Sequence, residues 1–195
     1  MATTLPIEDR EKVKEMLRYL RGKNPRDALL FQTGVNTILR IGDLLRLTVR
    51  HVMYPGTNYK IKKYIDIREQ KTGKYNRIII TSTLAPVLRA YITRYIGNKP
   101  DHYLFYRIRN NKDVNVPITR DWSSKILCRA AKECGIENFN TQSMRKTHAL
   151  HVYEATGKDG SLVQAMLNHS SPAVTLRYIG RTQKMMDAAK EIISF

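Results

Sequence analysis

The sequence predicts a mainly helical domain with a small three-stranded antiparallel β-sheet, an α+β fold. Apolar residues recur at helical spacing across residues 6–47 and again from residue 84 onward. Between these parts, residues 52–81 contain segments rich in β-branched and aromatic side chains, a pattern typical of strands. The 195 residues show no internal repeat and no linker-like stretch, which favours one medium-sized domain.

Three helices are predicted before the sheet. Residues 6–20 place apolar side chains on one face of an amphipathic helix, with charged residues between them. Asn24 followed by Pro25 is typical of an N-cap and a first-turn proline, so a second helix begins there, and Gly34 is expected to end it. Residues 37–47 are expected to form the third helix.

The expected strands are residues 52–54, 59–67 and 77–81. Residues 55–58 and 72–74 have the glycine, proline and asparagine content of tight turns, so neighbouring strands should run antiparallel. Lys71 then lies at the tip of the second hairpin.

The chain after the sheet returns to helical periodicity. The expected helices are residues 84–96, 119–134, 142–155, 161–168 and 172–179. Gly135, Gly157 and Gly160 separate several of them, as glycines near helix ends commonly do. Residues 182–195 carry an apolar stripe and are expected to form a separate terminal helix.

The charge balance points to an anionic macromolecule as partner. Lys and Arg number 34 against 17 Asp and Glu, a formal net charge of +17 that is spread along the whole chain. A folded, broadly basic domain most often binds nucleic acid, with an anionic membrane surface or ribosomal RNA as the competing partners. No apolar run is long enough to span a bilayer, and Cys128 and Cys134 lack metal-ligand spacing. We therefore expect no membrane partner, no metal and reduced cysteines.

A tyrosine and a histidine near the end of the chain form the strongest local pattern. His169 lies at the corner between two predicted helices, and Ser171 with Pro172 can cap and start the second one. Thr175 and Tyr178 then project from nearly one face. A tyrosine hydroxyl can act as a covalent nucleophile where nearby groups stabilise charge, although most tyrosines are buried with a satisfied hydroxyl.

Four stretches together resemble the catalytic domain of the tyrosine recombinase (phage integrase) family. They are Gly34–Leu45, Glu69–Lys74, Gln142–Thr147 and Leu167–Ser171, the last followed by Thr175 and Tyr178. Each motif alone is weak, but their order and the spacing of His169 and Tyr178 make the set specific. The likeness extends from about residue 7 to residue 180. It implies the mainly helical fold with a small sheet described above, and site-specific DNA recombination through a 3′-phosphotyrosyl intermediate.

The resemblance assigns two arginines to the scissile phosphate. Arg40 and Arg145 match the family's two arginine motifs, and rigid, bidentate guanidinium groups suit the charge that grows on a phosphodiester under attack. Read without the family, an arginine on a helix among apolar residues usually extends its charged end to solvent or pairs with a nearby carboxylate, and Asp43 lies three residues from Arg40. Within the family reading, Asp43 is a supporting residue that holds Arg40 or its neighbours in place.

The resemblance also assigns the groups that move protons and the nucleophile. Tyr178 attacks the phosphorus, Lys71 protonates the departing 5′ oxygen, and His169 hydrogen-bonds the phosphate or the nucleophile. Lys74 lies close enough to be confused with Lys71, and the motif alignment favours Lys71. A solvated turn lysine and a structural histidine are the ordinary alternatives for these two positions.

Two positions depart from the family pattern. Gln142 stands where a histidine is usual, which removes a proton acceptor for the tyrosine but keeps a hydrogen-bonding group. His148, further along the same helix, could partly substitute. Ile38 stands where glycine is common. Activity is expected, reduced by Gln142; the alternatives are a catalytically weak or silent DNA-binding member of the same fold and an unrelated basic RNA-associated domain.

The expected organisation is one catalytic domain, residues 1–180, and a tail or helix, residues 181–195, that docks on a neighbouring protomer. The N-terminal core-binding domain of most family members is expected to be absent, as in short members such as the fimbrial phase-switch invertases. The resemblance implies double-stranded DNA as partner, assembly from dimer to tetramer on DNA, DNA-bending accessory proteins, no cofactor, and a cytoplasmic, nucleoid-associated location.

Overall fold

The computed structural model describes residues 4–109, 112–180, 187 and 190–192. Its helices are α1 (Arg10–Lys23), α2 (Pro25–Asn36), α3 (Ile41–Leu45), α4 (Val49–Val52), α5 (Leu84–Tyr91) with the π-helical turn η1 (Ile92–Ile96), α6 (Arg120–Glu133), α7 (Thr141–Ala155), α8 (Gly160–Leu167) and α9 (Pro172–Tyr178). Its strands are β1 (Tyr64–Arg68), β2 (Tyr75–Ile79), β3 (Tyr106–Arg109) and β4 (Lys112–Pro117). The predicted mainly helical fold with antiparallel β structure is confirmed.

The cap predicted at the start of the second helix is confirmed. The Asn24 side chain accepts a hydrogen bond from the Arg26 N–H at 2.9 Å, and Pro25 occupies the first turn of α2. The prediction that Gly34 ends this helix is wrong, because α2 continues to Asn36. A Cβ on Gly34 would lie 2.4 Å from the sulfur of Met144, so this glycine allows α2 and α7 to pack closely.

The sheet differs from the prediction in its first strand. β1 and β2 pair antiparallel as expected, from Tyr64 opposite Ile79 to Arg68 opposite Tyr75. Residues 52–54 contribute an isolated bridge, Met53 opposite Ile61, and in the described chain the sheet has two strands instead of three. The reason is local: a capping box between Thr48 and His51 closes the helical turn α4 on the residues just before the bridge.

A second hairpin, β3 with β4, was not predicted. It pairs Tyr106 with Pro117 and Arg107 with Val114, with a register shift between these pairs. The alternation of polar and apolar residues in the sequence of β4 is the signal that could have revealed it.

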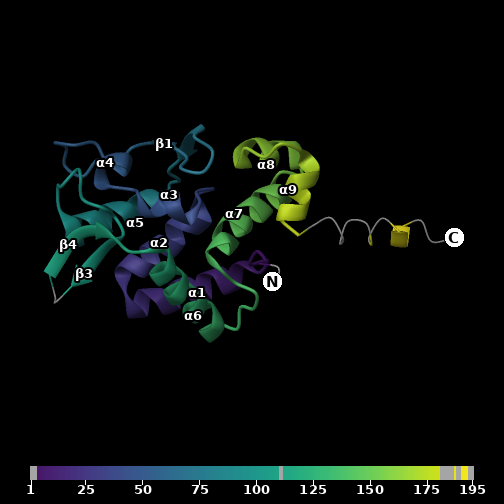
Figure 1. Ribbon diagram of the computed structural model, residues 1–195, viewed down its shortest axis with the longest axis horizontal. Coiled ribbons are helices and arrows are strands. Elements are labelled where there is room, and N and C mark those ends of the chain that lie inside the picture. Colours follow the sequence, from purple (N-terminus) through teal and green to yellow (C-terminus); the bar gives the residue numbers. More distant parts are fainter. Residues whose placement is uncertain (1–3, 110–111, 181–186, 188–189, 193–195) are drawn as a thin grey trace.

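The core lies between the N-terminal helices and α7. The largest fully buried side chains there include Phe31 of α2, Leu44 of α3 and Tyr153 of α7. In Figure 1, the β3–β4 hairpin lies at one end of the domain and α8 and α9 lie at the opposite end, against α7. The predicted helices of the C-terminal half are confirmed as α6 to α9, and most of residues 182–195 lie outside the described residues. In the described part of the chain, no helix combines the length and apolar character needed to cross a membrane.

Candidate active site

Arg40 lies at the start of α3, not within a helix as predicted. It is the N-cap residue, with extended backbone angles of φ −74° and ψ 152°. This geometry turns its side chain toward the β1–β2 hairpin, where its Nη1 pairs with Oε2 of Glu69. The Arg40 side chain is 20% exposed and that of Glu69 only 1%, so the pair has one face open to solvent and the other buried.

Glu69 is a site residue that the sequence analysis missed. Besides Arg40, its carboxylate accepts hydrogen bonds from Thr72 Oγ1 at 2.8 Å and from Asn76 Nδ2 at 3.1 Å. Burial raises the pKa of Glu69, but these donors together outweigh burial and hold the pKa below its ordinary value. The signal in the sequence was an acidic residue two positions before Lys71, which gains meaning only once the hairpin folds toward Arg40.

Replacing Glu69 by glutamine should destabilise the protein at neutral pH by about 1–2 kcal/mol, since hydrogen bonds to a charged group are worth more than neutral ones. Because the folded pKa is depressed, the stability contributed by the carboxylate is present above the ordinary value of 4.5 and is lost as the pH falls through the folded pKa. Denaturant unfolding of both proteins across pH 3–8 should therefore give curves that converge on the acid side. A constant gap across that range would contradict the charge argument.

Asp43 supports the hairpin and not Arg40. Its buried carboxylate accepts a hydrogen bond from the Gln70 backbone N–H at 2.9 Å and lies 3.6 Å from Nη1 of Arg46. The expected pairing with Arg40 is replaced by the Arg40–Glu69 pair, because the extended backbone of the N-cap directs the Arg40 side chain to the β1–β2 hairpin.

Lys71 occupies the turn between β1 and β2, as predicted. The turn is closed by the Gly73 N–H donating to the Glu69 carbonyl at 2.9 Å, and Gly73 has the left-handed φ of +65° that glycine accommodates. Lys71 is exposed and lines a hollow of about 390 Å³ together with Arg40 and Gln142. Lys74, the neighbouring candidate, does not line it.

Arg145 lies on α7 and is almost completely buried, with 2% of its surface exposed. Its Nη1 donates to the Ile38 carbonyl at 2.6 Å and its Nη2 to the Leu167 carbonyl at 2.9 Å. The guanidinium therefore joins the segment before α3 to the end of α8. Burial lowers the pKa of Arg145, and the nearby Tyr178 opposes that shift. A guanidinium remains charged at neutral pH despite such a shift.

His169 sits at the corner between α8 and α9. Asn168, with a left-handed φ of 56°, ends α8, and Ser171 caps α9, so the corner is defined on both sides. The ring Nδ1 lies 3.1 Å from Oγ1 of Thr175, one turn into α9. Burial, with the charges of Arg145 and Arg40, lowers the pKa of His169, which favours a neutral imidazole at pH 7.

Tyr178 lies next to His169 and Gln142. The rings of His169 and Tyr178 meet edge to face with centroids 5.0 Å apart, and Nζ of Lys146 lies 5.1 Å from the tyrosine ring centre. The tyrosine hydroxyl donates to Oε1 of Gln142 at 3.3 Å. His148 instead lies 3.0 Å from the Val35 carbonyl, on the contact with α2.

Arg40, Arg145, His169 and Tyr178 share one electrostatic environment. Burial raises the pKa of Tyr178 above its ordinary value, while the charges of Arg145 and Arg40 act in the opposite direction. The charges of the same two arginines lower the pKa of His169. The structure thus brings together two guanidinium groups, an imidazole and a phenol from four separate segments, with Lys71 and Gln142 on the adjoining hollow. Such a cleft can bind an oxyanion close to the phenolic oxygen.

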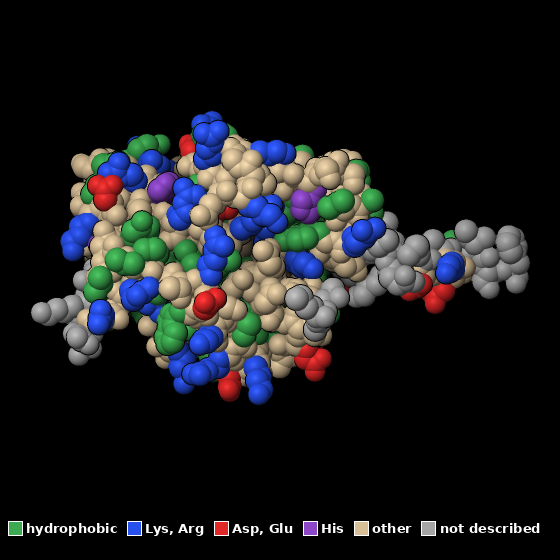
Figure 2. Space-filling view, viewed as in Figure 1, with side chains coloured by type: hydrophobic (Ala, Val, Ile, Leu, Met, Phe, Trp, Pro, Cys, Tyr) green, Lys and Arg blue, Asp and Glu red, His purple; other side chains and the backbone are tan. Residues whose placement is uncertain are grey.

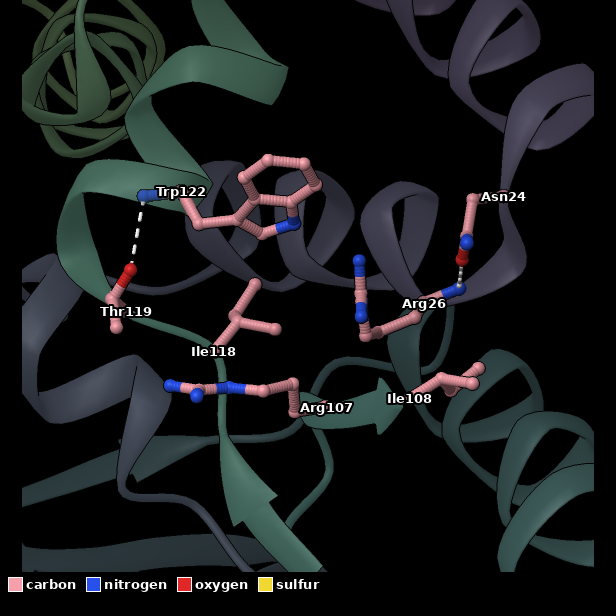
Figure 3. A pocket seen from close by; sticks show the side chains of 7 residues that line it. All are labelled: Asn24, Arg26, Arg107, Ile108, Ile118, Thr119 and Trp122. Carbon is pink, nitrogen blue, oxygen red and sulfur yellow. Dashed lines mark hydrogen bonds between the residues drawn. The ribbon is translucent and has the colours of Figure 1, made fainter. Parts of the chain in front are cut away.

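Other features of the described chain do not compete with this cleft. A larger hollow, of about 620 Å³, is lined by Asn24, Arg26, Arg107, Ile108, Ile118, Thr119 and Trp122 (Figure 3). Its buried guanidinium, Arg26, already donates to Asp27 and to the Tyr106 carbonyl. Within the described residues, no group of three or more His, Cys, Asp and Glu side chains could hold a metal ion.

Figure 2 shows Lys and Arg side chains spread over the visible face, with few acidic ones between them.

Comparison with known proteins places this geometry in a family. The model of the phage integrase family matches residues 9–185. The chain is 38% identical over 187 residues to the probable integrase/recombinase YoeC of Bacillus subtilis (strain 168). The aligned region covers 96% of this chain and 95% of YoeC.

Solved structures share the fold. XerA recombinase superposes with a TM-score of 0.70 at 17% identity, over 100% of this chain and 66% of that one. XerH site-specific recombinase bound to palindromic difH substrate superposes with a TM-score of 0.66 at 21% identity, over 96% of this chain and 52% of that one. The chain thus spans nearly all of YoeC but only about half to two thirds of these structures. It belongs to the phage integrase family, with the fold of a tyrosine recombinase catalytic domain.

Proposed function

We propose that this chain breaks and rejoins double-stranded DNA through a covalent bond between Tyr178 and a 3′ phosphate. The observation that carries the proposal is the position of the Tyr178 hydroxyl within the field of two guanidinium groups, Arg40 and Arg145, beside His169. Family membership supports the same activity.

The arginines are suited to the charge that develops during attack. Arg145 uses two of its donors on the Ile38 and Leu167 carbonyls, which fixes the guanidinium and leaves other N–H groups for a phosphate oxygen. Glu69 fixes Arg40 in the same way. Fixed donors stabilise the transition state without having to reorient during the reaction.

In the cleavage step one phosphorus–oxygen bond forms, another breaks, and two protons move. The Tyr178 oxygen bonds to phosphorus while the bond from phosphorus to the 5′ oxygen breaks, and Lys71 gives that oxygen its proton. The phenolic proton passes to solvent, because the Gln142 amide oxygen that accepts its hydrogen bond is too weak a base to take it. In rejoining, the 5′ hydroxyl of a partner strand attacks the phosphotyrosyl bond, and the phenol regains its proton. The phosphodiester energy is kept in the protein–DNA bond, so the proposed cycle uses no ATP.

The proposed partner is duplex DNA, bound by an assembly of two to four copies. The net charge of +17 suits phosphate contacts along a backbone. XerH is a relative in fold whose structure contains its difH substrate. Residues 181–195 are proposed to dock on the neighbouring copy. DNA-bending proteins would assist where two DNA sites must be brought together. The proposed location of recombination is the nucleoid, in the cytoplasm.

The decisive experiment is covalent trapping on a nicked suicide duplex chosen by binding selection. Cleavage beside the nick releases a short fragment, so the reverse reaction is lost and the covalent complex accumulates. We expect a complex that survives denaturing electrophoresis, with DNA attached at Tyr178 in the mass spectrum of its peptides. A salt-sensitive mobility shift without any covalent complex would instead identify a silent DNA-binding protein, the alternative that Gln142 favours.

Replacing Gln142 by histidine should accelerate cleavage about tenfold at pH 7–8, because an imidazole can accept the phenolic proton that the amide cannot. The raised pKa of Tyr178 keeps its phenol protonated at neutral pH, so cleavage by the native chain should rise steadily with pH. In the variant the rise should level off above the ordinary histidine pKa of about 6.5. Single-turnover trapping from pH 5.5 to 9 measures both profiles; parallel profiles would contradict this role.

A further inference from the structure

Arg120 is a cation in the candidate active site that neither the sequence motifs nor the proposed reaction uses. It is the first residue of α6, and its Nη2 donates to Oε1 of Gln70 at 2.7 Å. The Gln70 backbone N–H in turn donates to Asp43 at 2.9 Å. The residue immediately before Lys71 is therefore held by its side chain from α6 and by its backbone from α3.

The fold makes specific room for this contact. A Cβ on Gly42 of α3 would lie 2.4 Å from Nη2 of Arg120, so the guanidinium passes directly over the glycine. At the start of α6, the Thr119 side chain accepts a hydrogen bond from the Trp122 N–H at 3.1 Å (Figure 3). This cap fixes the first turn of α6, which carries Arg120. Arg120 also lines the same hollow of about 390 Å³ as Lys71 and Arg40.

We propose that Arg120 is a positioning residue for Lys71: through Gln70 it fixes the hairpin from which the lysine delivers its proton to the departing 5′ oxygen. The inference rests on the proposed function. In that step the bond from phosphorus to the 5′ oxygen breaks, a proton moves from the Lys71 ammonium to that oxygen, and the lysine is left neutral. A long, exposed lysine on a turn reaches a defined atom only if its backbone is fixed, and a displacement of about 1 Å can cost about 100-fold in rate.

A sulfur-substituted duplex separates this role from direct phosphate binding. When the 5′ bridging oxygen at the scissile phosphate is replaced by sulfur, the leaving group is a thiolate, which departs without a proton. Arg120→Gln should form the covalent complex about 30- to 100-fold more slowly than the native chain on the oxygen duplex, and within about threefold of it on the sulfur duplex. Lys71→Ala should show the same restoration by sulfur.

Two matched pairs exclude trivial explanations. Arg129→Gln removes an equal charge from the same helix and should leave both rates within about twofold. Gly42→Ala keeps the Arg120 charge but displaces its guanidinium, so it should reproduce the oxygen-specific loss. Gly22→Ala, at a helical glycine with nothing within 4 Å of the added methyl, should not. Thermal unfolding of each variant confirms that the fold is retained.

The outcomes are distinct. Equal losses by Arg120→Gln on both duplexes would show that Arg120 binds the phosphate directly, and no loss on either would show that it has no role; each overturns the inference while the proposed function stands. Absence of any covalent complex from the native chain on either duplex would overturn the proposed function, and the inference with it. Failure of sulfur to restore Lys71→Ala would remove Lys71 as the proton donor and end the positioning role of Arg120.

Discussion

Replacing Tyr178 by phenylalanine is expected to abolish the covalent protein–DNA complex, lowering the trapping rate by about 10⁴-fold or more, as loss of a nucleophile does in other covalent enzymes. The substitution removes a single oxygen from the cleft. The ring contact with His169, at 5.0 Å between centroids, and the Lys146 ammonium over the ring are both kept. The carboxylates near the cleft are not expected to take over the attack, because Glu69 is paired with Arg40 and Asp43 accepts a hydrogen bond from the Gln70 backbone N–H.

The same variant should keep its fold and its affinity for DNA. The lost hydrogen bond ends on the exposed Gln142, whose amide turns to water, so the free energy of unfolding should change by less than about 1 kcal/mol. Denaturant unfolding and a mobility shift with the suicide duplex provide the controls. A covalent complex formed by the phenylalanine variant would show that the nucleophile lies elsewhere in the chain.

Arg145 is expected to show the second largest effect, and to show it on both activity and stability. Replacement by alanine leaves the buried carbonyls of Ile38 and Leu167 without their donors, at about 1–3 kcal/mol each, and opens a cavity. Replacement by lysine keeps the charge but loses the planar fork that reaches both carbonyls at once. We therefore expect the lysine variant to unfold about 1–3 kcal/mol more easily and to cleave about 10²- to 10³-fold more slowly.

The lysine variant is the informative one, because the alanine variant confounds folding with chemistry. Its cleavage rate should be measured under conditions where denaturant unfolding shows it fully folded, with Arg129→Lys on α6 as the matched control. Cleavage at the native rate by Arg145→Lys would mean that charge alone matters at this position and that the fork geometry does not.

The sequence predicted those parts of the site whose geometry is set by neighbours along the chain. The start of the helix that carries Tyr178, just after His169, follows from capping rules applied to Ser171 and Pro172. The cap at Asn24 follows from the same rules. In each case the residues that decide the structure lie within one or two turns of each other.

The failures share the opposite cause. Glu69 reaches Arg40 across 29 positions, and Gln70 reaches Arg120 across 50, so neither pairing is visible in local spacing. Gly34 has the composition of a helix end, but its role is set by Met144, far away in the chain. The strand predicted at residues 52–54 did not form, because the Thr48–His51 capping box closes a helical turn just before it, and this local hydrogen bonding outweighs strand propensity.

The buried guanidinium of Arg145 has an evolutionary consequence. Because it ties Ile38 to Leu167, a lineage that abandons strand exchange cannot discard this side chain without weakening the folded protein, whereas it can discard the Tyr178 hydroxyl at little cost. A homologue that no longer recombines DNA but still binds it as a repressor should therefore retain arginine at position 145 and lose the tyrosine at position 178 first. In such a sequence, an arginine at the position of Arg145 would indicate an intact fold, whereas only a tyrosine at the position of Tyr178 would indicate an active enzyme.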